Sequence, residues 1–346
     1  MNIAVYVPLQ HAGSGFIVGT FFPLFKLFAD HRFLIITHPG SDLAVPGDFE
    51  FILIKPPPKN GLLKKLWIER TLANVLKKIS ADIFISAGNF CSMKASLPQY
   101  ILMPDPHRLK QVYVQKAQRM IVGSEWEKSK LKAALKIPGS KIEVVYPFVN
   151  EKFSPIEPEK REAIKNKYSQ GREYFLCTNS FHRPEDLINL LKAFSHFKKR
   201  QQSSFQLLLV TAQDASIKEK IANYKYRNDV AFIEPNPIEE AAAITAAAYA
   251  LVFPIITSED TSSVLHAMNS AVPVITINHS SINEMAGDAA MYAEDDIKDM
   301  GEKMMHLYKD ETLRFQLIEK GKERVKNFTI ERSASQLWRS VINALN

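Results

Sequence analysis

The sequence predicts an α/β protein made of two tandem, doubly wound, Rossmann-like domains with a cleft between them. The chain has 346 residues, which is too long for one ordinary core and suits two domains of about 150 residues each. Short apolar runs alternate with amphipathic stretches, as in a parallel sheet with helices on both faces. The alternation stops in the charged, proline-containing stretch 149–162, which we interpret as a linker, and then restarts. We expect domains over 1–155 and 165–325, and a last helix over 326–346 that packs back on the first domain.

Seven strands are expected in the first half. Each is a short, strongly apolar run bounded by turn or charged residues, which is typical of a buried strand. These runs cover residues 2–8, 32–38, 49–55, 81–87, 99–105, 118–124 and 141–147. Helical patterns lie between several of them, including 62–79 and 124–136.

The same alternation continues in the second half. Strands are expected over 173–179, 205–212, 229–235, 250–256 and 272–277. Helices are expected over 185–200, 215–223, 237–248, 262–270, 296–308, 310–326 and 329–345. Ligands of such sheets bind beyond the carboxyl ends of the strands, so the loops that follow strands are the candidate site.

Composition excludes several classes of protein. The two cysteines, Cys91 and Cys177, have no paired spacing, which argues for a reducing compartment and against a disulfide or zinc framework. The start of the chain lacks a signal-peptide pattern, and no apolar run is long enough to span a membrane. We therefore expect a cytoplasmic protein. The acidic stretch 295–299 lies at an expected helix start, where acids suit the helix dipole, and no metal site is expected.

Positive charge is concentrated in the first half. Residues 1–150 hold 19 Lys and Arg against 10 Asp and Glu, whereas the remainder holds 25 against 27. This asymmetry suggests an anionic partner for the first half. The basic, leucine-rich stretch 59–80 is either a core-facing helix with a solvated face or a helix that docks on an anionic membrane. Nucleic acid is not expected, because no recognised binding motif is present.

The later part of the chain resembles a known family. "PIITSEDTSSVLHAMNSAVPVI" (254–275) is similar to the P-S-x-x-E-G-F-G-x-x-x-x-E-A-M-A-x-G-x-P-V-V stretch of retaining glycosyltransferases of family four, the group 1 glycosyl transferases. The matching residues are Pro254, Ala267, Met268, Val272, Pro273 and Val274. "SINEMAGDAAMYAEDD" (281–296) and the closing stretch 308–338 also resemble this family. The resemblance covers most of 100–346 and is weak over 1–98.

The resemblance implies a GT-B fold and transfer of a hexose from a UDP- or GDP-linked sugar to a glycan or lipid-linked acceptor, with retained configuration. No cofactor is implied besides this donor substrate. An alternative is a catalytically impaired relative that binds a sugar nucleotide or serves as a partner subunit. The basic first domain suggests a possible anionic membrane surface as a further partner, on which the protein would bind peripherally at the inner face.

Four family positions are altered here. The first of the paired carboxylates is Ser258, with Glu259 one step later, and the second is His266. Glycine positions beside the first are Glu259 and Thr261. The family's Arg-Lys pair falls on Pro184 and Glu185, with Arg183 adjacent. The His-Asp step of the first domain is Pro104-Asp105, so only the acid remains.

These comparisons define the candidate site. The catalytic candidates are Asp105, Glu259 and Arg183. The candidates that bind the nucleotide and diphosphate are Gly15, Asn179, Arg183, Glu234, Pro235, Ser258, Thr261, Ser262, Ser263, Val264 and His266. Amides at the helix start near Ser262–Val264 suit a diphosphate; Arg183 offsets its charge; and Glu234-Pro235 is where the base would stack.

Each candidate has a purely structural alternative. Thr261 or Ser262 could simply cap a helix, the glycines near Gly15 could only form a turn, and Glu259 and Arg183 could be solvated charges. His266 could be a half-buried helical histidine without a ligand. As a ribose ligand it accepts one hydrogen bond where a carboxylate accepts two. We expect it to bind phosphate more strongly as pH falls through about 6.5.

Overall fold

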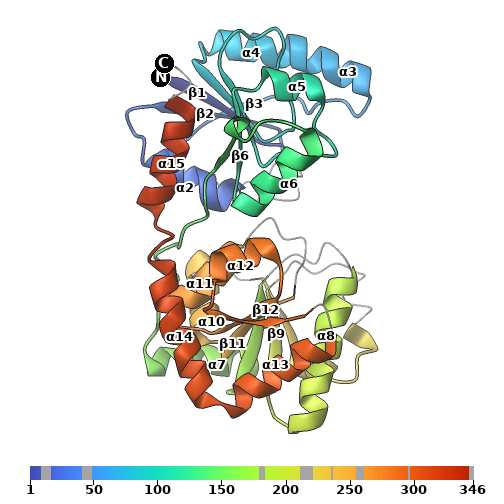
Figure 1. Cartoon of the computed structure of the whole chain (residues 1–346), viewed down its shortest axis with the longest axis vertical. Coiled ribbons are helices and arrows are strands. Elements are labelled where there is room, and N and C mark those ends of the chain that lie inside the picture. Colours follow the sequence, from blue (N-terminus) through green and yellow to red (C-terminus); the bar gives the residue numbers. More distant parts are fainter. Residues whose placement is uncertain are drawn as a thin grey trace. The chain divides into compact units, whose positions relative to one another are not determined.

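The structure is a computed structural model of the whole chain, and it describes residues 1–8, 17–40, 49–178, 184–210, 221–234, 237–254, 261–294 and 297–342. It divides into two compact units, each with its own sheet and core (Figure 1). Unit 1 comprises Met1–Pro147 with Ile330–Asn346, and unit 2 comprises Phe148–Thr329. The sequence placed the corresponding bounds near residues 155, 165 and 326.

Unit 1 has a seven-stranded parallel sheet in the order β3-β2-β1-β4-β5-β6-β7. Its strands are β1 (Asn2–Tyr6), β2 (Arg32–Thr37), β3 (Glu50–Leu53), β4 (Ile83–Ser86), β5 (Gln99–Leu102), β6 (Arg119–Val122) and β7 (Ile142–Val144). All seven strands expected from the sequence are present. On the central strand, Ala4 pairs with Leu34 of β2 on one side and Phe84 of β4 on the other. Strands that are buried on both faces read as nearly continuous apolar runs, which is why the sequence located them.

Helices flank this sheet. They are α2 (Phe22–Lys26), α3 (Gly61–Leu66), α4 (Ala73–Lys78), α5 (Gln111–Lys116), α6 (Glu125–Leu135) and α15 (Ile330–Ile342), with π-helical segments η1 (Ile17–Phe21) and η2 (Trp67–Leu72) and a 3₁₀ turn η3 (Gly139–Lys141). Helix α6 starts where Ser124 Oγ accepts the Glu127 amide at 3.1 Å and the Glu127 carboxylate accepts the Gly123 amide at 2.7 Å. Such reciprocal capping satisfies donors that have no partner inside the helix.

The C-terminal helix α15 belongs to unit 1, where it packs along α2 (Figure 1). The Trp338 ring stacks on Phe28, with centroids 4.3 Å apart, and on His31 at 4.5 Å. Tyr100 Oη donates to the Val341 carbonyl at 2.7 Å, which ties the end of α15 to strand β5. Two ring stacks and one buried hydrogen bond therefore fix this last helix on the first sheet.

Unit 2 has a six-stranded parallel sheet in the order β10-β9-β8-β11-β12-β13. Its strands are β8 (Tyr174–Thr178), β9 (Gln206–Val210), β10 (Val230–Ile233), β11 (Ala250–Phe253), β12 (Val274–Ile277) and β13 (Ala290–Ala293). Its helices are α7 (Pro158–Ser169), α8 (Pro184–Gln201), α10 (Ile238–Ala247), α11 (Ser262–Asn269), α12 (Ser280–Ala286), α13 (Ile297–Lys309) and α14 (Glu311–Val325), with a 3₁₀ turn η4 (Arg227–Asp229). The core includes Phe175, Leu208, Leu251 and Ile275, all fully buried. The expected fold class, two Rossmann-like α/β domains, is confirmed.

Two sequence interpretations need correction in this unit. The stretch read as a linker to residue 162 already contains helix α7, which begins at Pro158. Pro158 was in fact a sign of a helix start. Proline is favoured in the first turn of a helix, because its lack of an N–H has no cost there. The second correction concerns α12 and β13, since no helix or strand was expected from the sequence at these positions. Most of the helix expected over 215–223 lies outside the described residues.

Candidate functional site

The two sheets share one topological feature that locates ligand sites. Strand order reverses between β1 and β4 in unit 1, and between β8 and β11 in unit 2. Loops that leave these neighbouring strands run in opposite directions, which opens a crevice at the carboxyl ends. The segments after β1, β4, β8 and β11 are therefore where each unit is expected to hold a ligand.

In unit 2, the described part of this region is the start of α11. Thr261 is the N-terminal capping residue, yet its side chain makes no capping hydrogen bond. Thr261 therefore occupies the N-cap position, as the structural alternative expected, but does not cap the helix through its hydroxyl. The Val264 amide donates to the Thr261 carbonyl at 3.1 Å, so it is engaged within the turn. The half-buried residues Ser262 and Ser263 occupy the first turn.

The rest of α11 is anchored in the core. Val264, Leu265 and Ala267 are fully buried. Met268 packs against Gly321 of α14, where an added Cβ would lie 3.2 Å from the Met268 side chain. The Val272 amide donates to the Ala267 carbonyl at 2.9 Å and closes the turn into β12. The first turn of α11 is therefore carried on a rigid support.

His266 faces a specific partner within the same unit. Its ring stacks on Phe153, with centroids 4.0 Å apart and an interplanar angle of 6°. The Asn269 side chain donates to the Phe153 carbonyl at 2.5 Å and holds that residue in place. Desolvation in this environment lowers the pKa of His266 to about 4, because burial disfavours the charged imidazolium.

This low pKa corrects the expected pH response of His266. A histidine with this pKa stays neutral as pH falls through 6.5, so His266 gives no reason for phosphate binding to strengthen there. A neutral imidazole offers one donor and one acceptor. It can therefore form a hydrogen bond with a hydroxyl group but cannot neutralise the charge of a phosphate. Its assignment as a nucleotide contact remains a prediction.

The other nucleotide candidates are spread across the unit or lie outside the described residues. Glu234 directly follows the edge strand β10 and is exposed. The remaining candidates, which fall outside the described ranges, are Gly15, Asn179, Arg183, Pro235, Ser258 and Glu259. All of them stay predictions.

In unit 1, Asp105 organises the turn between β5 and α5. Its Oδ1 accepts the His107 amide at 2.9 Å, and its Oδ2 pairs with Arg108 Nε at 3.3 Å. Its own amide donates to Asn89 Oδ1 at 2.6 Å, which joins the loops after β4 and β5. Asp105 thus positions Arg108; its catalytic assignment remains a prediction.

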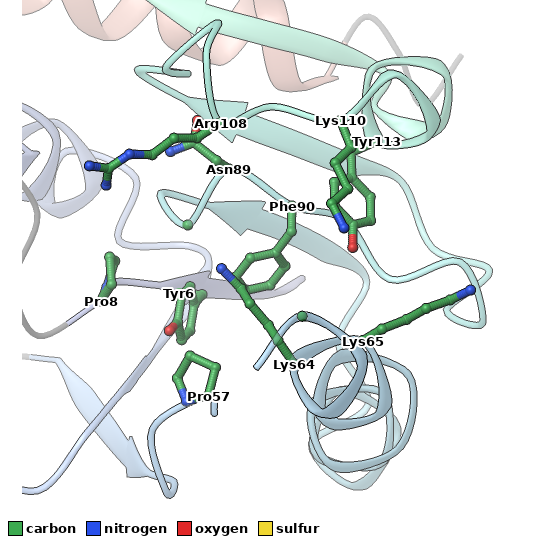
Figure 2. A pocket seen from close by; sticks show the side chains of 12 residues that line it. Tyr6, Pro8, Pro57, Lys64, Lys65, Asn89, Phe90, Arg108, Lys110 and Tyr113 are labelled. Atoms are coloured by element: carbon green, nitrogen blue, oxygen red, sulfur yellow. The ribbon is translucent and has the colours of Figure 1, made fainter. Parts of the chain in front are cut away.

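A pocket of about 320 Å³ lies beside this turn, at the carboxyl ends of β1 and β4 (Figure 2). It is lined by Tyr6, Pro8, Pro57, Gly61, Lys64, Lys65, Gly88, Asn89, Phe90, Arg108, Lys110 and Tyr113. Four of these described residues are cationic, and none is acidic. The pocket therefore lies at the topological switch point of the first sheet and carries positive charge.

The floor of the pocket is held by a buried hydrogen-bond chain. His38 Nδ1 lies 2.9 Å from the Ile54 carbonyl, and His38 Nε2 lies 2.9 Å from Tyr6 Oη. A carbonyl only accepts, so His38 Nδ1 donates this bond; in the tautomer with its proton on Nδ1 alone, Nε2 accepts a hydrogen bond from the Tyr6 hydroxyl. Burial raises the pKa of Tyr6 far above its usual value, so the phenol stays protonated and keeps this bond.

Gly88 and Asn89, which follow β4, suit the close packing and the backbone conformation at this position. A Cβ on Gly88 would lie 2.7 Å from Tyr6 Cε1 and would also collide with the Phe90 ring. Asn89 adopts a φ of +58°, a left-handed conformation that asparagine tolerates better than most residues. These two residues let the Phe90 ring lie against Tyr6, with centroids 5.1 Å apart.

Helix α3 carries two of the pocket cations and differs from the expected core-facing helix. None of its residues is buried, and Leu62, Leu63 and Leu66 are 71%, 51% and 43% exposed. Beyond it, η2 and α4 bury Trp67, Ile68, Leu72 and Leu76. The core-facing interpretation is therefore correct for 67–78 and wrong for 61–66.

Sequence reasoning missed most of this pocket. It noted Lys64 and Lys65 as part of a charged helix face, but not Arg108, Lys110 or Phe90. These residues are far apart in the chain, and only the parallel pairing of β4 with β1 and β5 brings them together. The residues directly after β4 and β5 could have indicated the pocket, because loops that follow neighbouring parallel strands meet at the same edge of the sheet.

Comparison with known families agrees with this architecture. The sequence model of the family described as glycosyl transferases group 1 matches residues 159–324, all within unit 2. Compared by sequence, the chain has no significant match among curated proteins.

Solved structures similar to this chain cover almost its whole length. A glycosyltransferase from Rickettsia africae has a TM-score of 0.80 and 18% identity, over 100% of this chain and 98% of its own. Anabaena HepE (Alr3699), solved with UDP and glucose, has a TM-score of 0.80 and 14% identity, over 99% and 100%. Sucrose-phosphate synthase from Thermosynechococcus elongatus has a TM-score of 0.78 and 16% identity, over 99% of each chain. The chain has the fold of GT-B glycosyltransferases.

Two other kinds of site are absent from the described ranges. No helix there is long and apolar enough to cross a bilayer. No group of three or more His, Cys, Asp or Glu side chains there could hold a metal ion. Cys91 and Cys177 are both free and buried, and burial raises the pKa of the Cys91 thiol to about 12.

Proposed function

We propose that the protein is a hexosyltransferase that moves a sugar from a nucleotide-diphosphate donor to a glycan or lipid-linked acceptor with retained configuration. The observation that carries this proposal is the start of α11. It follows the switch-point strand β11 within the segment matched by the group 1 family model. That HepE was solved with UDP-glucose supports a nucleotide-sugar donor.

In the proposed reaction, the bond between the anomeric carbon and the β-phosphate oxygen breaks, and the nucleoside diphosphate leaves. An acceptor hydroxyl forms the new bond to the same carbon and passes its proton to the departing diphosphate. Amides at the first turn of α11, together with Arg183, would hold the diphosphate as its charge grows. Glu259 and neutral His266 would contact sugar or ribose, Glu234-Pro235 the base, and Asp105 the acceptor side.

A donor panel tests the proposal. Full-length protein is titrated by calorimetry with UDP- and GDP-linked hexoses, and release of nucleoside diphosphate is then followed with candidate acceptors. Binding with acceptor-dependent release supports the transferase. Binding without any release across the acceptor panel supports instead a sugar-nucleotide-binding partner subunit, and the altered family positions Ser258 and His266 would then be its cause. Absence of binding by every UDP- and GDP-linked sugar contradicts both versions.

A pair of serine substitutions tests whether the nucleotide contacts α11. Ser263→Ala removes a hydroxyl from the first turn of the helix. It is expected to weaken donor binding several-fold, since one hydrogen bond contributes about 1 kcal/mol. The matched control is Ser204→Ala, which removes an exposed hydroxyl from the segment before β9 in the same unit and is expected to leave donor binding unchanged. Equal effects of the two substitutions would contradict a specific contact at α11.

A further inference from the structure

The basic pocket of unit 1 concentrates positive charge from two segments far apart in the sequence. Lys64 and Lys65 come from α3, and Arg108 and Lys110 come from the turn before α5. Within the described part of the chain, none of the three lysines pairs with a carboxylate; Arg108 alone does, with Asp105. Like charges brought this close repel one another unless an anion joins them.

The electrostatics of Lys64 show that these cations interact. Its side chain is half-buried, and its ammonium lies 5.7 Å from the centroid of the Phe90 ring. Burial lowers its pKa first, and repulsion from Lys110 and Arg108 lowers it further. An anion placed among these groups would relieve both effects, because it replaces lost solvation and offsets the repulsion.

The shape of the pocket limits the ligand. Its volume of about 320 Å³ is near the lower end of the range for small-molecule sites, about 300–1,000 Å³. Figure 2 shows Lys64 beside Phe90 and Lys110 beside Tyr113, while Lys65 extends away from Phe90. An aromatic floor with cations around it suits a small ligand that has one strongly anionic group.

We propose that this pocket binds the phosphate group of a phosphorylated ligand, and, resting on the proposed function, that this ligand is the sugar acceptor. A phosphate monoester carries a charge of about −1.5 to −2 at neutral pH and three acceptor oxygens. Several lysines and a guanidinium match that charge better than they match a single carboxylate. The phosphate belongs either to a soluble sugar phosphate or to a lipid phosphate; exposed leucines on the same helix α3 would suit the lipid.

The test is direct binding to full-length protein without donor. Hexose 6-phosphate is titrated by calorimetry against the same hexose without phosphate. In parallel, vesicles of phosphatidylcholine with phosphatidic acid are compared with phosphatidylcholine alone. The pocket variant is Lys64→Gln/Lys110→Gln. The matched control is Lys77→Gln/Lys78→Gln, which removes the same charge from exposed positions of α4 outside the pocket.

We expect the pocket variant to weaken phosphate binding about tenfold or more, since two charge-assisted contacts are lost, and the control to change it less than twofold. Binding of hexose phosphate identifies a soluble acceptor, and binding of phosphatidic-acid vesicles alone identifies a lipid-linked one. The proposal is overturned if neither probe binds, or if both variants lose binding equally. Because donor is absent, a failed transferase assay leaves this result intact, so the two proposals can fail separately.

Discussion

The two units have the same strand order at their switch points but present different chemistry there. In unit 1, four cations are among the residues that line the pocket, whereas the described part of unit 2 offers hydroxyl residues, backbone groups and a neutral histidine at α11. On our proposals, the first arrangement would attract an anion by net charge, and the second would select a ligand by directional hydrogen bonds. One topology can therefore serve two ligands, and side chains near the switch point determine which.

Loss of the ring that covers His266 should have the greatest effect on unit 2. Phe153→Ala removes a buried ring that covers His266, and a Phe→Ala change in a core costs about 3–5 kcal/mol. With its ring solvated, His266 is expected to titrate close to its ordinary pKa of about 6.5. Chemical denaturation measures the first effect and histidine NMR titration the second. An unchanged pKa of His266 would show that Phe153 is not the cause of its desolvation.

A second substitution distorts the charged side. Gly88→Ala forces the Tyr6 and Phe90 rings apart, and overpacking of this kind costs about 1–3 kcal/mol. Phosphate binding should fall with it, since Phe90 forms the floor. Gly61→Ala is the control, because nothing lies within 4 Å of an added Cβ there. Equal losses of stability in the two variants, measured by urea unfolding, would contradict the packing argument.

The third prediction concerns pH. His266 has a pKa of about 4 in the folded chain against about 6.5 when unfolded. Its neutral state therefore contributes stability that is present above pH 6.5 and is lost as pH falls toward 4. Between about pH 7.5 and about pH 5, the wild type should lose about 2 kcal/mol more than His266→Gln, which does not titrate. The stability is measured by urea unfolding. If the free energy of unfolding changed by the same amount with pH in both proteins, the prediction would be wrong.

A minor effect is expected from the hydrogen bond beneath the pocket. Tyr6→Phe removes the hydrogen bond to His38 Nε2, which costs about 1 kcal/mol. Phosphate affinity should be nearly unchanged, because the lost hydroxyl carries no charge. Calorimetry with hexose 6-phosphate and thermal unfolding separate the two effects. A large loss of affinity with no loss of stability would instead make the Tyr6 hydroxyl a ligand contact.

The sequence predicted the sheets well because both-face burial leaves apolar runs such as those of β1 and β9. It missed α7, whose charged sequence hides a helix that starts at Pro158 and buries Lys165 between Glu162 and Glu173. Because its ion pairs allow Lys165 to be buried, this face of α7 lacks the apolar residues by which a helix is usually located. Helix α12 was missed because it is only seven residues long, and strand β13 because its sequence, AMYA, lacks the Val, Ile and Leu residues that mark the other strands.

The site was less predictable, for a physical reason. The environment of His266 depends on Phe153, which is distant in sequence, so its lowered pKa could not be read from its neighbours on α11. Arg108 and Lys110 join Lys64 only through the pairing of β4 with its neighbours β1 and β5. Resemblance to a family located α11 but not this pocket, because the resemblance is weak over residues 1–98.

We propose that the two units bind different anionic ligands by different means. Calorimetry in which hexose 6-phosphate is titrated into protein already saturated with a nucleoside diphosphate tests this directly. We expect phosphate binding to be unaffected by the bound nucleotide, and to be lost in Lys64→Gln/Lys110→Gln while nucleotide binding persists. Competition between the two ligands, or loss of both in that one variant, would contradict the account.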